Sequence, residues 1–293
     1  MLVAINELNP VERQHWLQYA IAPRPIALAS TMDPAGQVNL APFSFFNLFS
    51  TTPPIVIFSP VRRVRNNTSK HSLDNLQELP ELVINIVDYD MVQQTSLASC
   101  EYPKETNEFI KAGFTPVQAS IVKPPMVKES RVKMECRVQK IIPLGNTGGS
   151  GNLVICEVLL MHVDESILND AGTMIDQTRL HHVARLGGNW YCRTDVDNLF
   201  EVEKPNVQLG IGFDQLPESI RNSSILTGND LARLANVEHL PSIDPSFEDA
   251  HLRQIIQYYS VNPEEMEKEM HIYARRLIAM NQVREAWQVL LSA

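Results

Sequence analysis

Short apolar runs alternate with turn-forming residues up to about residue 195. Runs of strand length at 25–31, 54–59 and 82–87 predict β-strands, because proline and aspartate punctuate their ends. Residues 32–37 contain Pro34 and Gly36, so the first strand is expected to turn there into a hairpin. This spacing is typical of a protein built mainly from β-strands.

The clearest long hairpin is expected between residues 131 and 163. Two segments rich in Val and Ile, 131–143 and 153–163, flank the glycine-rich stretch 145–152. That stretch lacks the Lys-Ser/Thr ending of a phosphate-binding loop and leads into a strand. A hairpin connection is therefore the favoured interpretation of the glycines.

Helical patterns are fewer in this part of the chain. Three leucines recur at helical spacing within residues 70–79, and one residue of Asn67-Thr68-Ser69 is the expected N-cap. Residues 89–99 are expected to form another short helix, and residues 109–119 a loop. Many short strands with few short helices favour a closed or Greek-key β-barrel over a doubly wound sheet.

The pattern changes near residue 195. Prolines punctuate residues 195–246, where one short helix is expected near 230–236. Asn262-Pro263-Glu264-Glu265 resembles a capping motif and is expected to open one last helix. This helix carries an apolar stripe, which we expect to pack on the barrel or on a neighbouring helix, with a subunit contact as the alternative. The stripe consists of Met266, Met270, Tyr273, Leu277, Met280, Trp287 and Leu291.

Composition narrows the function classes. The net charge of −9 argues against a nucleic-acid partner, because phosphate backbones are bound by clustered cations. No apolar run approaches membrane-spanning length, and the N-terminus does not read as a secretory signal. The four cysteines form no Cys-x-x-Cys pair, so we expect neither zinc binding nor redox exchange, and a reducing cytoplasm fits best.

One basic cluster stands out in this acidic chain. It lies between a predicted strand and a predicted helix and consists of Arg62, Arg63, Arg65 and Lys70. Helix N-termini bind phosphate, and the hydroxyls of Thr68 and Ser69 would add donors. The alternative is a solvated loop whose polar residues only cap the helix.

Polar side chains in two neighbouring segments suit the rim of a flavin. Ser30 and Thr31 close one strand, and Ser44 and Asn47 lie in a second segment whose backbone N–H groups, from residues 41 to 46, are further donors. Ordinary turn chemistry is the alternative for the polar residues, and core packing is the alternative for the phenylalanines.

Residues 179–191 hold a second polar concentration. The adjacent His181 and His182 do not suggest a metal site, since neighbours on a strand face opposite ways. Arg179 and Arg185 would suit a cofactor or the phosphates of a nicotinamide donor, with surface salt bridges as the alternative. Neither a Gly-x-Ser-x-Gly elbow nor a Gly-x-Gly-x-x-Gly motif after a strand is present.

Four blocks together resemble the flavin reductase-like proteins with an FMN-binding split barrel. They are Arg24-Pro-Ile-Ala-Leu-Ala-Ser30, Asn39-Leu-Ala-Pro-Phe-Ser44, Pro53-Pro54 and 182–191. The resemblance covers residues 12–193 and implies a homodimeric split β-barrel that binds FMN near the subunit interface. It also implies reduction of flavin by NADH or NADPH, often for a partner monooxygenase. Residues 194–293, a mostly helical extension, lie outside it and receive no function.

The resemblance also implies roles for individual residues. His182 or Arg185 would orient the hydride donor, and no metal ligand is expected. The family commonly has Lys-Asp-Thr before the helix, where this chain has Asn66-Asn67-Thr68. The expected FMN-binding residues are Ser30, Thr31, Ala41, Pro42, Phe43, Ser44, Phe45, Phe46, Asn47, Ser59, Arg62, Asn67 and Thr68.

Two other hypotheses remain open. One is a non-catalytic flavin-binding or interaction protein whose C-terminal helices occupy the approach of the donor or dock a partner. The other is a split-barrel relative that uses haem or pyridoxal phosphate, which is disfavoured because the sequence offers no placed axial ligand.

Overall fold

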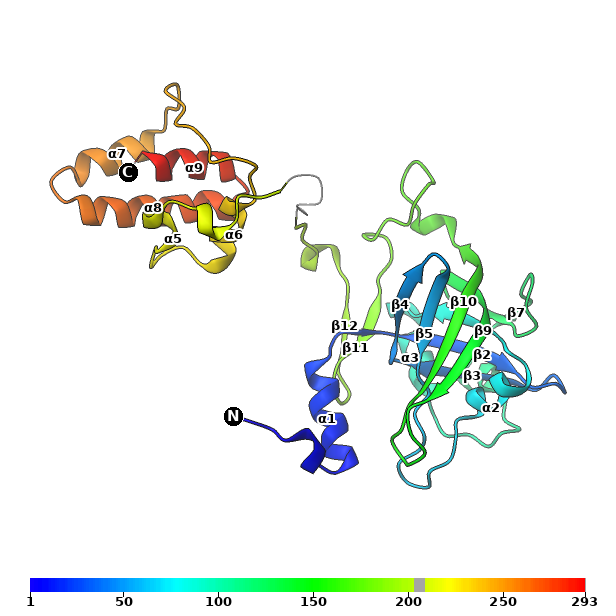
Figure 1. The fold of residues 1–293 in the computed structure, drawn as a ribbon. Coiled ribbons are helices and arrows are strands. Elements are labelled where there is room, and N and C mark those ends of the chain that lie inside the picture. The colour runs from blue at the N-terminus through cyan, green and yellow to red at the C-terminus, as the bar shows by residue number, and fades with distance from the viewer. Residues whose placement is uncertain (203–208, 293) are drawn as a thin grey trace. The chain divides into compact units, whose positions relative to one another are not determined.

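The computed structural model describes residues 1–202 and 209–292, which divide into two compact units, 1–199 and 200–293 (Figure 1). The division falls shortly after residue 193, where the sequence analysis placed a domain boundary. That the two parts act as separate functional domains stays a prediction.

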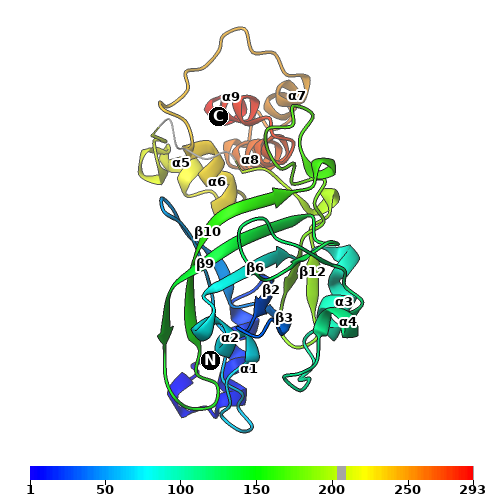
Figure 2. The same ribbon diagram turned by 90° about the vertical axis from the view of Figure 1, so that its right-hand side faces the viewer.

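A seven-stranded antiparallel sheet forms the centre of the first unit. Its order is β3-β2-β6-β9-β10-β5-β4, and the long hairpin β9–β10 forms its middle (Figure 2). The strands are β2 (Ala27–Met32), β3 (Val38–Phe43), β4 (Phe46–Thr51), β5 (Pro54–Phe58), β6 (Glu81–Ile86), β9 (Val132–Pro143) and β10 (Asn152–Val163). The predicted strands and the long hairpin are thereby confirmed.

The two edge strands of this sheet, β3 and β4, are consecutive in the chain but do not pair with each other. Only Ser44 and Phe45 separate them, so the chain leaves one edge and enters the other within a single sharp bend. β3 and β4 are thus the two edges of the sheet that are not joined by pairing. The expected fold, a mainly-β split barrel with short helices and a helical C-terminal part, is confirmed.

Smaller elements surround the sheet. A three-stranded sheet has the order β1-β11-β12, and β7 pairs with β8. These strands are β1 (Arg24–Pro25), β7 (Pro116–Val117), β8 (Met126–Val127), β11 (Val183–Arg185) and β12 (Tyr191–Arg193). The helices are α1 (Pro10–Ala20), α2 (His71–Glu78), α3 (Val92–Leu97) and α4 (Glu108–Ala112), with 3-10 turns at Ile5–Glu7, Tyr89–Met91, Glu165–Ile167 and Val196–Asn198.

Strand β2 is buried on both faces, which explains its run of apolar residues without alternation. Ala27 and Ala29 point to the core that contains Leu73 and Leu76 of α2. Leu28 points to a second core on the other face, with Phe109 of α4. The segment that carries the most recognisable sequence block is therefore the strand on which two cores meet.

Two local expectations about helices were wrong, and one helix was not predicted. Helix α2 begins at His71 with Lys70 as its N-cap, not Asn67, Thr68 or Ser69, and no side chain caps it; the Ser69 hydroxyl donates to Asp74 at 2.6 Å. Residues 109–119 are not all loop, since Glu108 to Ala112 form α4. Helix α1 went unpredicted, although its Asn9 and Glu12 form a capping box.

The second unit is a small helical domain with its own apolar core. It contains a 3-10 turn at Phe213–Gln215 and the helices α5 (Glu218–Arg221), α6 (Gly228–Ala235), α7 (Ala250–Tyr258), α8 (Pro263–Ala279) and α9 (Val283–Leu291). Trp287 is fully buried and donates its indole N–H to the Leu234 carbonyl at 3.2 Å. The described part of this unit contains no β-strand.

The expected single last helix is two helices. The chain turns after Ala279, where Asn281 adopts a left-handed conformation with φ of 63° and the Gln282 N–H bonds back to the Leu277 carbonyl. Met280 therefore ends a helix and is exposed, although its spacing placed it in the apolar stripe. Asn262 does cap α8 as predicted, by accepting a hydrogen bond from the Glu265 N–H. Among the described residues, none of the helices has both the length and the apolar character needed to cross a bilayer.

A buried carboxylate fixes the loop that precedes β8. The side chain of Glu135 on β9 is fully buried and accepts hydrogen bonds from the N–H groups of residues 120, 121 and 122 at 2.7–3.0 Å. His162 Nε2 lies 2.6 Å from the same carboxylate. Burial raises the pKa of Glu135, but these hydrogen bonds outweigh it, and the pKa lies below its ordinary value. The ionised form is thus the one that the fold stabilises.

We predict that Glu135→Gln lowers the free energy of unfolding by about 2 kcal/mol, because charge-assisted hydrogen bonds are lost and an amide NH₂ faces backbone donors. The folded-state pKa is depressed, so the contribution is complete above the unfolded pKa and disappears as the pH falls through the folded value. Urea unfolding at pH 7 and at stepwise lower pH measures both effects. The matched control is Glu78→Gln, because Glu78 is exposed; an equal loss for both variants would contradict the prediction.

Candidate functional site

The basic loop, residues 60–70, has a defined internal geometry. The Arg62 Nε donates to Asn67 Oδ1 at 2.7 Å, and Asn67 is held in a left-handed conformation with φ of 55°. Arg63 donates to the Thr68 hydroxyl at 2.9 Å and to the Ser69 carbonyl. Asparagine tolerates the left-handed conformation better than most residues do. The two arginines are thereby fixed on one short loop.

The cationic side chains of this loop differ in whether they pair with a carboxylate. Glu101 binds Arg63 at 3.1 Å and Arg65 at 3.2 Å, and it lies 3.9 Å from Lys70. Burial and the nearby Arg63 lower the pKa of Lys70, while Glu101 opposes them. Within the described residues, Arg62 pairs with no carboxylate. Arg62 is therefore the loop cation whose charge is left for an external anion.

The glycine-rich connection between β9 and β10 packs directly on this loop. A Cβ on Gly148 would lie 2.9 Å from the Val64 carbonyl oxygen, closer than real Cβ contacts allow. The Arg62 N–H bonds to the Ser150 carbonyl, and the Gly149 N–H bonds back to the Arg62 carbonyl. The hairpin connection predicted from sequence is confirmed, and its glycines permit the close contact that holds the basic loop.

Ser59 provides a test of fit for an added phosphate. It ends the β5 region just before the basic loop, and its Oγ is buried without a hydrogen-bond partner among the described residues. A Cβ on Gly151 would lie 2.6 Å from this oxygen, so any side chain at position 151 would clash with the Ser59 hydroxyl. Ser59 comes three residues before Arg62 in the chain, and its unpaired hydroxyl is a donor that fits a phosphate group, which accepts hydrogen bonds at every oxygen.

Residues 41–47 run from the end of β3 into β4 and contact Ser59, the residue just before the basic loop. The Ser59 N–H donates to the Phe45 carbonyl at 2.8 Å, which ties the bend of the split to the start of the loop. Phe43 is buried against Phe58, with ring centroids 5.1 Å apart, whereas Phe45 and Asn47 are exposed. Core packing is thus the role of Phe43, and Ala41, Pro42, Ser44 and Phe46 are partly buried.

Ser30 and Thr31 are placed differently from the rest of the predicted set. Both side chains are fully buried on β2, and the Thr31 hydroxyl accepts a hydrogen bond from Asn75 Nδ2 at 3.2 Å. Ser30 Oγ has no hydrogen-bond partner among the described residues. Neither hydroxyl reaches the surface of the unit, so contact of these side chains with a flavin ring stays a prediction.

A cleft of about 360 Å³ lies between α3 and the β11–β12 hairpin. Arg185 lines it and stacks on Tyr191 at 4.5 Å from the ring centroid, while Arg193 stacks on Tyr89 at 4.3 Å. Arg185 and Tyr191 are direct cross-strand neighbours, which explains the first stack. Both guanidiniums are attracted by the electron-rich ring faces and held over them.

His182 lies outside this cleft. His182 and Asp88 form an isolated antiparallel β-bridge through their main chains. Because side chains alternate along a strand, those of residues 182 and 185 lie on opposite faces. Burial lowers the pKa of His182, with Asp88 opposing, so the imidazole is neutral near pH 7. The structure therefore does not bring His182 and Arg185 together.

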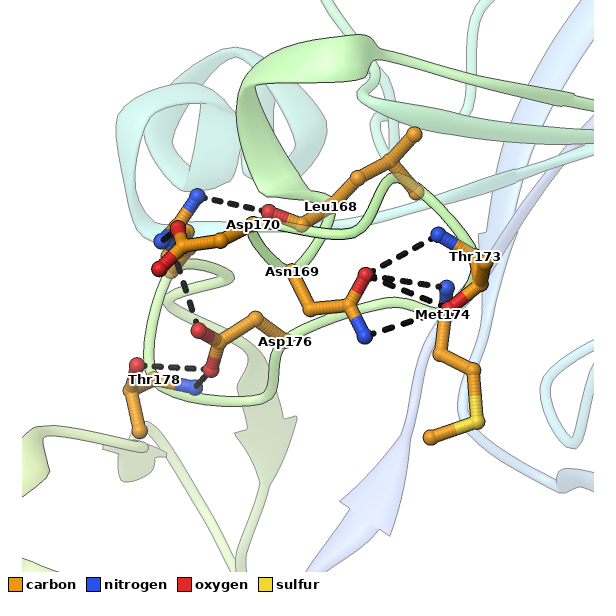
Figure 3. A network of polar contacts seen from close by, with 8 residues as sticks. Leu168, Asn169, Asp170, Thr173, Met174, Asp176 and Thr178 are labelled. Carbon is orange, nitrogen blue, oxygen red and sulfur yellow. Dashed lines mark hydrogen bonds and ion pairs between the residues drawn. The ribbon is translucent and has the colours of Figure 1, made fainter.

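Arg179 is a structural residue. Its guanidinium pairs with Asp170 and with Asp176, the latter at 3.2 Å, and donates to the Leu168 carbonyl. Figure 3 shows the two carboxylates and the Asn169 hydrogen bonds of this loop. The salt-bridge alternative is correct for Arg179, because both neighbouring aspartates already neutralise it.

Several site residues escaped sequence reasoning. Glu101 follows the basic loop by more than thirty positions and carries no local signal of its contact with Arg63. Gly148 and Gly151 were assigned to a hairpin connection without their packing partners. Arg193 and Tyr89 show their relation only once β12 is placed beside α3. Across residues 1–202 and 209–292, no group of three or more His, Cys, Asp or Glu side chains is arranged to hold a metal.

Comparisons with known proteins agree with this arrangement. The model of the flavin reductase like domain matches residues 19–183. An uncharacterized protein of Halalkalibacterium halodurans is 35% identical over 204 residues, which are 69% of this chain and 95% of that protein.

Two solved structures have a similar fold. Nitrilotriacetate monooxygenase component B from Bacillus cereus has a TM-score of 0.64 and 28% identity, over 69% of this chain and 98% of that one. A Shewanella frigidimarina protein described as a flavin reductase with a split barrel domain has a TM-score of 0.58 and 27% identity, over 68% and 96%.

The matched residues include the seven-stranded sheet, the bend at 44–45 and the basic loop, whereas the second unit lies beyond them. Because its family model spans more than half of the sequence, this chain belongs to the flavin reductase-like family.

Proposed function

We propose that the protein is an FMN-dependent oxidoreductase that transfers hydride from NADH or NADPH to flavin. The observation that carries the proposal is the basic loop, in which Arg62 pairs with no carboxylate of the described residues, together with the unpaired hydroxyl of Ser59 just before the loop in the chain. A singly phosphorylated flavin suits one such anion site. Family membership supports the choice of flavin.

In this proposal, Arg62, Ser59 and Thr68 hold the phosphate, and Asn67 orients Arg62 through its hydrogen bond. The exposed part of residues 41–47 would receive the ring, through backbone N–H groups and the side chains of Ser44 and Asn47. When bound, FMN supplies the hydride acceptor, so no acid or base of the chain is required for the transfer. The protein binds and orients the reactants.

The donor side of the proposal involves Arg185 more directly than His182. Arg185 lies in the cleft beside α3, while the neutral His182 lies against Asp88. We therefore assign Arg185 to the anionic part of the donor and leave His182 as a support of the β11 backbone. Its amide and carbonyl groups bond to residues 180 and 194.

Anaerobic stopped-flow mixing of FMN-loaded protein with NADH and with NADPH tests the activity. The proposal predicts that at least one donor bleaches the visible flavin absorbance in a single saturable phase. This absorbance lies at about 450 nm, as in flavins generally. A protein fully loaded with FMN that neither donor bleaches would instead be a non-catalytic flavin-binding protein.

A second experiment isolates the phosphate site. We predict that Arg62→Gln weakens FMN binding about tenfold or more, because a charge-assisted hydrogen bond is worth about 1.5–3 kcal/mol. Binding of riboflavin, which lacks the phosphate, should change little. Fluorescence titration with both flavins measures this difference, and Arg137→Gln on the exposed face of β9 is the matched control. Equal weakening for both flavins would contradict the assignment.

We also propose that the protein is a homodimer. Helix α1 has no buried residue although it carries Trp16, Leu17 and Tyr19. The edge strand β4 exposes Leu48 and Phe49 at 59% and 63%. Exposed apolar surface of this extent on an edge strand suits a second copy of the chain.

We predict a dimer in sedimentation equilibrium and a shift toward monomer for Phe49→Asp, since a charge would be buried at the interface. Ile110→Asp on α4 is the control, because Ile110 is exposed at 78% outside both surfaces. A wild-type protein that remains monomeric at micromolar concentrations would exclude the dimer.

The proposed setting is a reducing cytoplasm, which suits four cysteines that are all free thiols. A monooxygenase that consumes the reduced flavin is the proposed partner. The component B of nitrilotriacetate monooxygenase, with its similar fold, supports that idea.

A further inference from the structure

The cleft between α3 and the β11–β12 hairpin has a lining suited to an anion. Its charged side chains are two arginines, Arg185 and Arg193, and it contains no Asp or Glu. Its neutral polar side chains are Gln93, Ser96 and Asn189, whose side chains make no hydrogen bond to the described residues. The residues that line the cleft thus offer donors and no carboxylate; the one acid that contacts them, Asp195, binds Arg193 from outside the lining.

The strand register explains why the arginines face the same space. Val183 pairs with Arg193, and Arg185 pairs with Tyr191, so these four side chains lie on one face of the hairpin. This is the face that lines the cleft together with residues of α3. Arg193 is anchored by Asp195 at 2.8 Å, and Arg185 donates to the Gly188 carbonyl at 2.8 Å. The remaining N–H groups of both guanidiniums are available to a ligand.

A second observation points to an anion independently of the cleft. Arg24 on β1 is the direct cross-strand partner of Arg185, and like charges opposite each other are unfavourable. Arg24 is buried, and its terminal nitrogens bond only to the carbonyls of residues 18, 21 and 186. Within the described residues, no acidic side chain pairs with Arg24 or Arg185, so the positive charge of this pair favours a bound anion beside Arg185.

We propose that this cleft binds the oxyanion group of a small organic ligand, a phosphate or a carboxylate, between Arg185 and Arg193. Planar guanidiniums bind both groups through paired hydrogen bonds, and the stacking on Tyr191 and Tyr89 fixes the planes before the ligand arrives. The volume of about 360 Å³ falls in the range of about 300–1,000 Å³ that is usual for ligand pockets.

The binding of an oxyanion group does not depend on the proposed function. Only the identity of the molecule that carries this group rests on it. A phosphate would come from the diphosphate of the nicotinamide donor, and a carboxylate from an organic acid that accepts electrons. ADP-ribose and benzoate represent these two sources, because neither can be reduced by the protein or reduce a flavin.

Isothermal titration of the FMN-loaded protein with each probe at low and at moderate salt tests the proposal. We expect one probe to bind, with affinity that falls as salt is added. Arg193→Gln and Arg185→Gln should each weaken that binding at least tenfold, and Arg193→Lys should weaken it less, because it keeps the charge and loses the planar fork. Arg137→Gln, on the exposed part of β9, should leave it unchanged.

The outcomes separate the two claims. Binding of ADP-ribose identifies the donor as the source of the anion, and binding of benzoate identifies an acidic acceptor. If neither probe binds, or if the three cleft variants bind as the wild type does, the cleft proposal is overturned even when NADH bleaches the flavin. If a probe binds but no donor bleaches the flavin, the cleft proposal stands and the hydride-transfer proposal fails.

Discussion

The close packing of the β9–β10 connection on the basic loop is the contact on which the proposed site depends. Gly148 approaches the Val64 carbonyl so closely that no side chain fits, and reciprocal hydrogen bonds join Arg62 to residues 149 and 150. Arginines on a free loop would repel one another and spread into solvent. Here the longest hairpin of the sheet holds them in place, so the site inherits the rigidity of the sheet.

Charge on that loop is then distributed by a single carboxylate. Glu101 neutralises Arg63 and Arg65 and leaves Arg62 without a carboxylate partner among the described residues, which is why one anion, not several, suits the site. The same logic applies at the α3 cleft, where Asp195 anchors Arg193 and no acid of the described residues pairs with Arg185 or Arg24. In both places a carboxylate holds at least one arginine in position, while a neighbouring arginine, Arg62 or Arg185, pairs with no acid of the described residues.

The sequence predicted the strands, the long hairpin and the basic loop, because apolar runs, turn residues and clustered cations are local signals. It misplaced the start of α2, since the helix begins at His71 without a side-chain cap, so the polar residues before it give no capping signal. It joined α8 to α9, because the apolar spacing continues across the left-handed Asn281. The partners Glu101 and Arg193 were beyond its reach, since their contacts join residues far apart in the chain.

A crystal structure of the protein grown with saturating FMN tests the central claim most directly. The account predicts the phosphate at Ser59 and Arg62, with the ring along residues 41–47 and the Arg62–Asn67 hydrogen bond retained. Density for the phosphate away from the basic loop, or a groove along residues 41–47 closed by protein side chains, would contradict it.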